Sequence, residues 1–575
     1  MLRGDGKGRE QKAEDIIMET AVSSGERMMI PMKKNDEVEL EITDITDEGF
    51  GVGRVRDGSG TGGYVVFVPG AAPGDVAAVR ILKAGRSFGY GRVTSLLRAS
   101  ELRTDPACPV FGRCGGCTLR HITYEAELQL KKKWIADSLR RCGGTDAGDF
   151  PIYSAGPERY RNKAEYPAGT GPDGRLFFGL YAPRSHRTVD VGDCLLEPEF
   201  YGDIAAAAAG FCNRRGLTAY ADGTGGTVRH LYIRDARATG EVSVSLIVSS
   251  PSLPFADEFA DAVTAVCPQA VSVSCIVNDR PGNVILGDRL TVIRGRDTLT
   301  DVLCGVEFRI SPMSFYQVNH DGAELLYRTA GDFAGAKAGD TVLDLYCGAG
   351  TVGLCVAPPG TRLIGVDIVP ESIENARENA ALAHRTDAEF FCADAGSAAM
   401  RLAGEGIRPD TVIVDPPRRG CGDEVFEAAK AMSPEKIVMI SCNHVTCARD
   451  ISRFAEIGYS VRRLAAVDMF PRTAHVETVV LLRREKIDDH LEFTWTDEKF
   501  GNKGCKATYP EIIAYIQEKY GFKVSHLNIA QIKRKCGIIE RENYNLPKSE
   551  NSRQAGCTVE KEAAIMDAFR HFQLI

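Results

Sequence analysis

The sequence predicts an α/β protein built around a doubly wound parallel sheet, preceded by a small β barrel and followed by a helical extension. Strand and helix patterns alternate through residues 306–485, which is typical of a parallel sheet with helices on both faces. Short strands separated by Gly and Pro fill residues 33–97, as expected for an OB-like barrel, a common nucleic acid-binding module. Beyond residue 485, "TYPEIIAYIQEKYGFKVSHLNIAQIKRKCG" and "EKEAAIMDAFRHF" have helical patterns.

A chain of 575 residues is too long for one hydrophobic core, so several domains are expected. The predicted order is a flexible N-terminus, the barrel, a mixed α+β central domain, the α/β domain and the helical extension. Their predicted bounds are 1–29, 30–98, 99–305, 306–485 and 486–575.

Composition is that of an ordinary soluble protein, with 44% hydrophobic and 26% charged residues. No apolar run approaches the ~18 residues that span a membrane, and the polar N-terminus has no signal-peptide core. We therefore expect a cytoplasmic protein with no membrane partner. The net charge of −8 means that nucleic acid binding would need a local basic surface. The 18 cysteines are scattered, so most should be free thiols and a tight cluster would be a metal candidate.

A nucleotide site is predicted at "DTVLDLYCGAGTVGL" (340–354), where an apolar strand leads through Gly348, Gly350 and Gly353 into a helix. Glycines let a ligand approach the backbone, and the helix N-terminus offers free N–H groups. The next strand ends in Asp367, about 20 residues on, where a carboxylate can hold ribose hydroxyls.

Two later strands also end in carboxylates. "AEFFCAD" ends in Asp394, which is placed to meet an adenine amino group, and "TVIVDPPRRG" contains Asp415. NAD and S-adenosylmethionine both fit the glycine loop and Asp367, and turn glycines in an unliganded α/β fold are the third interpretation. The D-P-P segment favours S-adenosylmethionine, because in many methyltransferases this loop faces the transferable methyl group.

The strand "EKIVMISCN" places Cys442 at the same sheet edge. The thiol is core filler, a metal ligand or a nucleophile, and a methyl-donor site favours the nucleophile. A thiolate added to C6 of uracil makes C5 reactive, and a base must then remove the C5 proton. "DMFPRTAHVETVVLL" (468–482) offers His475 and Glu477 as base candidates, although Glu477 also fits a surface carboxylate on an edge strand.

These motifs together resemble the bacterial RNA uracil-C5 methyltransferases, which make 5-methyluridine in 23S ribosomal RNA and in tRNA. The resemblance covers roughly residues 30–485 and rests on "DLYCGAGTVGL", "VDPPRRG", "SCNHVTCARDI" and "DMFPRTAHVETV". It implies a Rossmann-like class I S-adenosylmethionine methyltransferase domain with Cys442 as nucleophile and Glu477 as general base. His444 stands where the family usually has proline.

The resemblance also implies cofactor contacts. "SPMSFYQVN" (311–319) is similar to a family segment whose glutamine, here Gln317, touches the cofactor. Asp367 replaces a more usual glutamate, and Thr351 replaces a common asparagine. The predicted cofactor residues are Gln317, Tyr346, Gly348, Gly350, Thr351, Asp367, Asp394 and Asp415.

A cysteine cluster is predicted in "CPVFGRCGGC", which contains Cys108, Cys114 and Cys117, with Cys194 of "VDVGDCLLEP" as the best fourth ligand. Four thiolates suit zinc or a [4Fe–4S] cluster, and the spacing leaves both open, as well as a chance grouping of core cysteines. The resemblance implies the [4Fe–4S] cluster, which ribosomal members of the family carry, and identifies the barrel as a TRAM domain.

The predicted substrate is therefore a loop uridine of 23S ribosomal RNA, flipped into the site of a monomeric enzyme. A tRNA uracil-C5 methyltransferase is the nearest alternative, although simpler tRNA members lack both the cluster and the barrel. A non-catalytic RNA-binding iron–sulfur protein is the alternative from another class. Arg161 and Lys163 in "YRNKAEYPAG", like the basic "QIKRKCG" (531–537), are interpreted as phosphate contacts or as ordinary charged surface.

Overall fold

The computed structural model describes residues 32–56, 63–221, 223, 225–282, 284–485, 509–522, 524, 529, 532 and 559–572. The predicted flexible N-terminus at 1–29 lies outside this part, and so does "QIKRKCG" apart from Ile532. The chain divides into two compact units, Met1–Lys486 and Ile487–Ile575. Each unit is described by itself.

A closed five-stranded barrel opens the described chain, in the order β1-β2-β3-β5-β4. Alternate side chains point inward, and Leu40, Val66 and Val79 lie in its core. Gly91 allows close strand packing, since an added Cβ would lie 2.3 Å from a methyl carbon of Val79. The strands are β1 Glu37–Ile45, β2 Phe50–Arg56, β3 Gly63–Pro69, β4 Val76–Ala84 and β5 Phe88–Arg98.

A six-stranded sheet with the order β14-β13-β12-β11-β7-β8 forms the centre of the following region. The predicted hairpin at "VRHLYIRDARATGEVSVSLIVSS" is the antiparallel pair β11–β12. Helices α3 (Phe200–Arg214) and α4 (Ala256–Val266) bury apolar residues against this sheet. The strands are β7 Lys163–Thr170, β8 Leu176–Phe178, β11 Val228–Asp235, β12 Val242–Val248, β13 Ala270–Val277 and β14 Arg289–Gly295.

Two short hairpins complete this region. Strands β9 (Leu180–Tyr181) and β10 (Thr188–Val189) form one antiparallel pair, and β15 (Leu299–Leu303) and β16 (Val306–Ile310) form the other.

The α/β region contains an eight-stranded sheet with the order β19-β18-β17-β20-β21-β23-β22-β6. The five strands from β19 to β21 are parallel, whereas β23 runs antiparallel to both neighbours. The bounds are β6 Ile152–Tyr153, β17 Thr341–Leu345, β18 Arg362–Asp367, β19 Ala388–Cys392, β20 Thr411–Val414, β21 Lys436–Ser441, β22 Tyr459–Val467 and β23 Glu477–Arg484.

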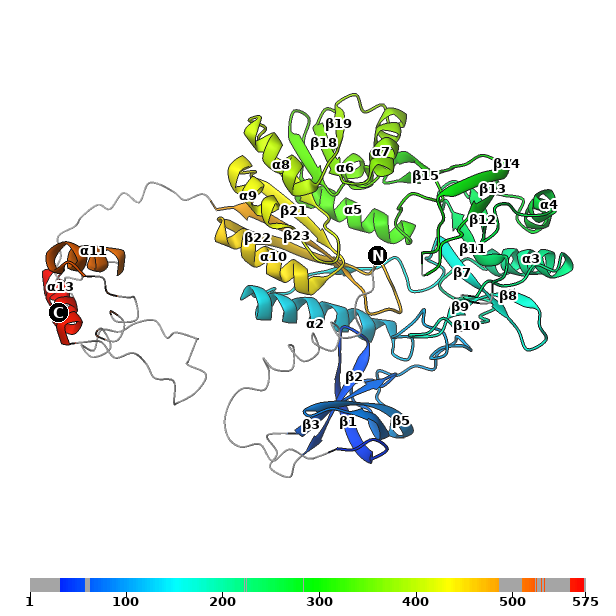
Figure 1. Cartoon of the computed structure of the whole chain (residues 1–575), viewed down its shortest axis with the longest axis horizontal. Coiled ribbons are helices and arrows are strands. Elements are labelled where there is room, and N and C mark those ends of the chain that lie inside the picture. Colours follow the sequence, from blue (N-terminus) through cyan, green and yellow to red (C-terminus); the bar gives the residue numbers. More distant parts are fainter. Residues whose placement is uncertain are drawn as a thin grey trace. The chain divides into compact units, whose positions relative to one another are not determined.

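Helices cover both faces of this sheet, as expected for a doubly wound fold (Figure 1). Ile437 and Met439 of β21 join the apolar cluster with α8, α9 and α10, whereas Val438 and Ile440 join the cluster with α5, α6 and α7. The helices are α5 His320–Ala334, α6 Thr351–Val356, α7 Pro370–Leu382, α8 Ala395–Gly404, α9 Asp423–Met432 and α10 His444–Glu456.

Helix α2 (Tyr124–Gly143) and strand β6 come from the predicted central domain but belong to the α/β core. Ile135 and Leu139 of α2 are buried in the cluster with α8, α9 and α10, and β6 pairs with β22 at the sheet edge. An amphipathic pattern shows which helix face is buried but not what buries it. Residues on both sides of the predicted boundary at residue 305 therefore contribute to one hydrophobic core.

The second unit contains helices α11 (Tyr509–Tyr520) and α13 (Val559–His571), in agreement with the predicted helical extension. Ile512, Ile516 and Phe569 are among its buried residues. Asp567 of α13 accepts hydrogen bonds from Tyr515 and Lys519 of α11. Among all described residues, no helix is both long enough and apolar enough to cross a membrane.

Candidate active site

Predicted site residues gather at the carboxyl edge of the parallel strands. Each follows or ends a different strand, so adjacent strands bring them to one edge. Strand order reverses between β17 and β20, which is the usual binding crevice of open α/β sheets. The residues are Tyr346 after β17, Asp367 at the end of β18, Asp394 after β19, Asp415 after β20 and Cys442 after β21.

Glu477 reaches the same edge because β23 runs in the opposite direction. Ser441 of β21 pairs with Thr478 of β23. In an antiparallel pair the residue after one partner faces the residue before the other, so Cys442 lies opposite Glu477. Glu477 is only 4% exposed, whereas Cys442 is half-buried in the loop before α10.

Burial raises the pKa of both groups and so favours their protonated forms. Burial, and next the Glu477 carboxylate, raise the pKa of Cys442 to about 11, while Arg418 acts to lower it. Burial and Asp415 raise the pKa of Glu477 to about 8, again opposed by Arg418. A base whose pKa lies near neutrality is well matched to proton transfer at physiological pH.

Burial also raises the pKa of two aspartates, Asp415 and its neighbour Asp344. The pKa of Asp415 rises to about 7 and that of Asp344, within β17, to about 8. Asp344 accepts a 2.8 Å hydrogen bond from the Gly353 amide, and its second oxygen has no partner among the described residues. A Cβ on Gly353 would lie 2.7 Å from this carboxylate, so the third glycine of the loop is needed for close packing.

Hydrogen bonds join the glycine loop to Asp367 at the end of β18. Gly350 has φ of 78° and caps α6, a conformation that glycine adopts freely. The carboxylate of Asp367 accepts hydrogen bonds from the backbone amides of Gly348 (3.0 Å) and Val369 (2.9 Å). Tyr346 has φ of 68°, so the aromatic residue of this loop has a backbone conformation that is uncommon outside glycine.

Three further predicted cofactor residues are Thr351, Asp394 and Gln317. Thr351 begins α6, and its hydroxyl lies 3.4 Å from the Tyr327 hydroxyl. Asp394 is exposed and caps α8 by accepting from the Ser397 amide. Gln317 is half-buried, and its backbone carbonyl accepts a 3.0 Å hydrogen bond from the Asn162 side chain.

Arg161 and Lys163, on either side of Asn162, are the two candidate phosphate contacts in this segment. Lys163 forms an ion pair with Glu165 at 2.9 Å, which agrees with the ordinary interpretation of that residue. Arg161 is half-buried and forms a β-bridge with Asn319.

Arg418 was missed by sequence reasoning, although the D-P-P-R motif contains it. Its guanidinium lies 3.4 Å from His475 and influences the pKa of both Cys442 and Glu477. Its carbonyl accepts a 3.1 Å hydrogen bond from the Asn443 side chain, which also caps α10. A hydrogen bond therefore joins the loop that contains D-P-P-R to the loop that contains S-C-N.

His444, the departure from the family pattern, joins three parts of the chain. Its Nδ1 lies 2.7 Å from the Ser138 hydroxyl of α2. Its Nε2 lies 3.6 Å from Asp47, which is in the turn between β1 and β2 of the barrel. A proline at the first turn of α10 would fit the helix but could make neither contact.

A buried ion cluster fixes the loop that leads to Glu477. Lys131 of α2 is fully buried and contacts Glu127 at 2.7 Å and Asp468 at 2.8 Å. Asp468 also accepts from Tyr124 at 2.8 Å. A buried charge needs such partners because desolvation is costly.

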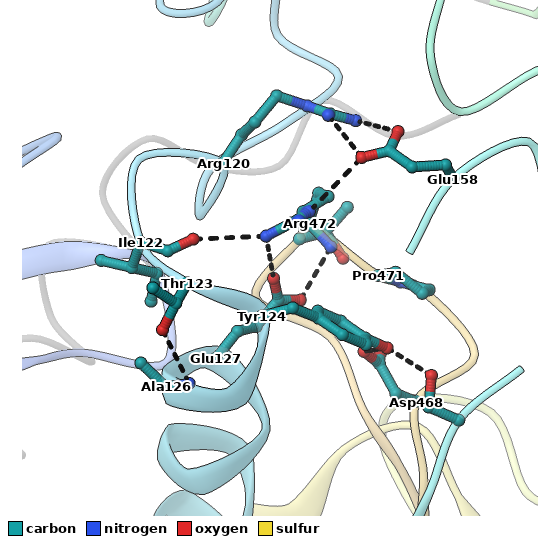
Figure 2. Close-up of polar contacts among 12 residues, drawn as sticks. Arg120, Ile122, Thr123, Tyr124, Ala126, Glu127, Glu158, Asp468, Pro471 and Arg472 are labelled. Carbon is teal, nitrogen blue, oxygen red and sulfur yellow. Dashed lines mark hydrogen bonds and ion pairs between the residues drawn. The ribbon is translucent and has the colours of Figure 1, made fainter. Parts of the chain in front are cut away.

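The same loop is held at Arg472, whose backbone amide donates to Glu127 at 2.7 Å. The Arg472 carbonyl accepts from the amides of Thr118 (2.9 Å) and Leu119 (3.1 Å), directly after Cys117. Arg120 contacts Glu158 at 2.8 Å, and Arg472 lies 3.9 Å from the same carboxylate (Figure 2). The cysteine-containing segment therefore contacts the loop that leads to Glu477.

The four predicted ligand cysteines line one pocket. Cys108, Cys114 and Cys117 surround it together with Cys194, and Val110 and Leu180 are among its apolar neighbours. The Gly116 amide donates to the Cys114 sulfur at 3.4 Å, and N–H···S bonds of this kind help to stabilise cluster-bound thiolates.

The thiol donors suit a [4Fe–4S] cluster or zinc. Within the described ranges, no group of three or more His, Cys, Asp or Glu side chains is arranged so that it could hold a metal ion. A metal group at this pocket therefore stays a prediction.

The sheet order, the glycine loop and the carboxylates at the strand ends define a class I S-adenosylmethionine-dependent methyltransferase. Family models agree: residues 296–485 match the tRNA (Uracil-5-)-methyltransferase model, and residues 31–94 match the TRAM domain model.

Individual relatives extend the similarity to most of the chain. An uncharacterized RNA methyltransferase of Bacillus cereus is 36% identical over 463 residues, which cover 80% of this chain and 99% of the relative. One of Clostridium tetani is 34% identical, covering 79% and 97%. The crystal structure of Pyrococcus abyssi tRNA (uracil-54, C5)-methyltransferase with S-adenosyl-L-homocysteine has a TM-score of 0.61 and 26% identity, covering 77% of this chain and 100% of that one.

The chain therefore belongs to the RNA uracil-C5 methyltransferase family with an N-terminal TRAM domain. The reaction of that family is S-adenosylmethionine-dependent methylation of RNA uracil at C5.

The buried ion cluster predicts a large cost for losing Lys131. Lys131→Met removes the buried ammonium partner of the Glu127 and Asp468 carboxylates and should lower the unfolding free energy by about 3–5 kcal/mol. Urea denaturation measures this loss. Lys132→Met is the matched control: Lys132 pairs with Asp149, which is 95% exposed, and such exposed pairs contribute little to stability. Equal losses in the two variants would contradict the assignment.

The pKa of about 8 for Glu477 predicts a pH-dependent stability. The unfolded chain releases this proton near its ordinary pKa of 4.5, whereas the folded chain keeps it until about 8. Stability from the protonated form is therefore present at low pH and is lost as pH rises through 8. Glu477→Gln mimics the protonated form, so its melting temperature should exceed the wild-type value at pH 8.5 but match it near pH 4.5.

Glu435→Gln serves as the control for this measurement, because Glu435 is 61% exposed beside Arg483. Its effect should be small and similar at both pH values. A Glu477→Gln shift of the same size at pH 4.5 and 8.5 would show that the pKa of Glu477 is ordinary.

Proposed function

We propose that this protein methylates C5 of a loop uridine in 23S ribosomal RNA, with Cys442 as the nucleophile and Glu477 as the general base. The observation that supports the roles most strongly is the register of β21 and β23, which sets the thiol opposite the carboxyl group. Arg418 faces both groups, and Asp415 lies beside them. A thiol and a base within reach of one ring are what addition followed by elimination requires.

The bonds at the ring follow in order. The Cys442 thiol releases its proton to solvent and its sulfur bonds to C6, which moves the ring electrons onto C5 and O4. S-adenosylmethionine, when bound, supplies the methyl group that C5 accepts. Deprotonated Glu477 then removes the C5 proton, the double bond reforms, and the C6–S bond breaks to release Cys442. Arg418 favours the anionic forms of both groups.

The residues at the strand ends are proposed to hold S-adenosylmethionine. Asp367 would bind the ribose, Asp394 the adenine amino group, and the amides of Gly348 and Gly350 with Tyr346 the loop side of the cofactor. Asp415, Gln317 and Thr351 would complete the cofactor site. The buried, protonated carboxyl of Asp344 supports the loop through Gly353.

We also propose that Cys108, Cys114, Cys117 and Cys194 hold a [4Fe–4S] cluster. Their shared pocket and the Gly116 N–H···S bond support this. Uracil methylation needs no electron transfer, so the proposed role is to hold the segment that contacts Arg472. The cysteine set and the barrel favour 23S ribosomal RNA as substrate.

Methylation of tRNA is the second candidate, because the Pyrococcus abyssi enzyme with a TM-score of 0.61 acts on tRNA. A protein that only binds RNA would be expected to carry another residue in place of Cys442 or Glu477, and both residues are present here.

The substrate and the two catalytic roles are tested together with RNA from a strain that lacks the gene. Deproteinised 23S ribosomal RNA should accept labelled methyl groups in the presence of S-adenosylmethionine, and total tRNA should not. Cys442→Ala should reduce the rate by roughly 10⁴-fold or more. Glu477→Gln should slow turnover by about 10²–10⁴-fold and accumulate covalent protein–RNA complexes.

RNA containing 5-fluorouridine should trap the wild-type protein, because fluorine at C5 cannot leave as a proton. Cys392→Ala, which removes an exposed thiol at the end of β19, is the control and should still form the trapped complex. Methylation of tRNA alone would replace the proposed substrate with the second candidate. Normal methylation by Cys442→Ala would refute the mechanism.

The cluster is tested by metal analysis of anaerobically purified protein. Serine at any of Cys108, Cys114, Cys117 or Cys194 should remove most of the iron and acid-labile sulfide, because each thiolate is a ligand. Cys142→Ser, at an exposed position in α2, should leave both unchanged. Zinc without sulfide in the wild-type protein would contradict an iron–sulfur cluster.

A further inference from the structure

Residues 311–319 join β16 to α5 and contain Gln317, one of the proposed cofactor residues. The first part of this segment is a turn in which the side chains of Met313 and Phe315 are 44% and 70% exposed. Burial of these two apolar side chains therefore contributes little to holding the turn. Polar contacts from other elements must help to fix where the segment lies.

A buried arginine of the central sheet makes two such contacts. Arg234, near the end of β11, is 3% exposed, and its guanidinium donates to the backbone carbonyls of Ser311 (3.1 Å) and Ser314 (3.0 Å). A buried guanidinium is costly to desolvate, and these two hydrogen bonds offset part of that cost. One side chain of the central sheet therefore holds both ends of the turn at 311–314.

Asn162 holds the next part of the segment. It is 1% exposed; its side chain donates to the Gln317 carbonyl at 3.0 Å, and its amide donates to the Val318 carbonyl at 2.9 Å. The Asn162 carbonyl in turn accepts a 3.0 Å hydrogen bond from the amide of Asp235, the last residue of β11. These contacts relate the backbone of Gln317 to the end of β11.

The Gln317 side chain faces the methyltransferase domain instead. It contacts the hydroxyl of Tyr327, a buried residue of α5. The same hydroxyl lies 3.4 Å from that of Thr351, which begins α6 directly after the glycine loop. Gln317 therefore has its backbone held from the central sheet and its side chain beside another proposed cofactor residue.

We propose that Arg234 and Asn162 are positioning residues for S-adenosylmethionine, which set the place of Gln317 in the cofactor site from the central sheet. Both act through the backbone of residues 311–319 rather than by touching the cofactor. A hydrogen bond weakens steeply when its geometry shifts, so loss of either support lowers cofactor affinity. This inference rests on the proposed cofactor role of Gln317 and assigns part of the affinity to residues outside 306–485.

The test measures the Kd for S-adenosyl-L-homocysteine by isothermal titration calorimetry, with the full-length protein and no RNA. Arg234→Met removes the donors but keeps an unbranched side chain, and Asn162→Ala removes the side-chain donor but keeps the backbone one. Each should raise Kd by about 5- to 30-fold. Arg234→Lys should restore part of the affinity, because an ammonium group can also donate to two carbonyls.

Arg229→Met is the matched control. Arg229 lies on the same strand as Arg234, is 5% exposed and donates to the carbonyls of Arg280 (2.7 Å) and Gly282 (3.1 Å), in the loop after β13. Its loss should lower the melting temperature about as much as loss of Arg234 does, because both are buried arginines bonded to loop carbonyls. It should leave the Kd for S-adenosyl-L-homocysteine unchanged.

A double-mutant cycle shows whether Arg234 acts through Gln317. Gln317→Ala alone should raise Kd, and adding Arg234→Met should raise it little further, because the contact that Arg234 positions is already gone. Independent losses that multiply would overturn the inference. An unchanged Kd in both Arg234→Met and Asn162→Ala would also overturn it, and so would an equal rise in Arg229→Met.

Kinetics with RNA separate this inference from the proposed function. Arg234→Met should raise the KM for S-adenosylmethionine more than it lowers kcat, because it does not touch the reacting atoms, and the opposite pattern would contradict a positioning role. An unchanged Kd in Gln317→Ala would refute the proposed cofactor role of Gln317 itself. The expected Kd pattern in a protein that methylates neither 23S ribosomal RNA nor tRNA would support the positioning residues and refute the proposed function.

Discussion

The antiparallel pairing of β23 with β21 is the constraint on which the candidate site depends. In a parallel sheet every strand brings its last residue to the carboxyl edge, so a base carried at the start of a strand would lie at the far edge. Reversal of one strand brings Glu477 to the edge where Cys442 and the carboxylates of β18, β19 and β20 already lie. A nucleophile and a base from separate segments then face each other through backbone hydrogen bonds alone.

The pairing keeps Glu477 opposite Cys442 only if the loop before β23 has a fixed position. The buried charged residues of α2 fix that position. Lys131, Glu127 and Asp468 are expensive to bury, and their mutual contacts offset that desolvation. They join α2 to the loop, while His444 joins α10 to α2 and to the barrel. Contacts from the cysteine-containing segment to Arg472 add a third support. The loop is therefore held from several directions while Cys442 stays half-exposed.

Charged side chains in the site and beside the barrel have different surroundings. Burial raises the pKa values of Asp344, Asp415 and Glu477, which favours their neutral forms. Beside the outer aromatic rings of the barrel, the guanidinium groups of Arg54, Arg92 and Arg184 are instead exposed to solvent. A chain with a net charge of −8 can bind a polyanion only through such a local surface.

The sequence by itself determined the alternation of strands and helices, the barrel, and the placement of Asp367, Asp394, Asp415 and Cys442 at strand ends, because local periodicity reports burial and strand direction follows from the crossover helices. Tertiary structure alone decided the reversed register of β23, the recruitment of α2 and β6 into the α/β core, and the contacts of His444 and Arg418. Ser138 and His444 are 306 residues apart. An apolar face or a lone polar residue in the sequence specifies that a partner is needed, but only the packed chain selects which partner it is.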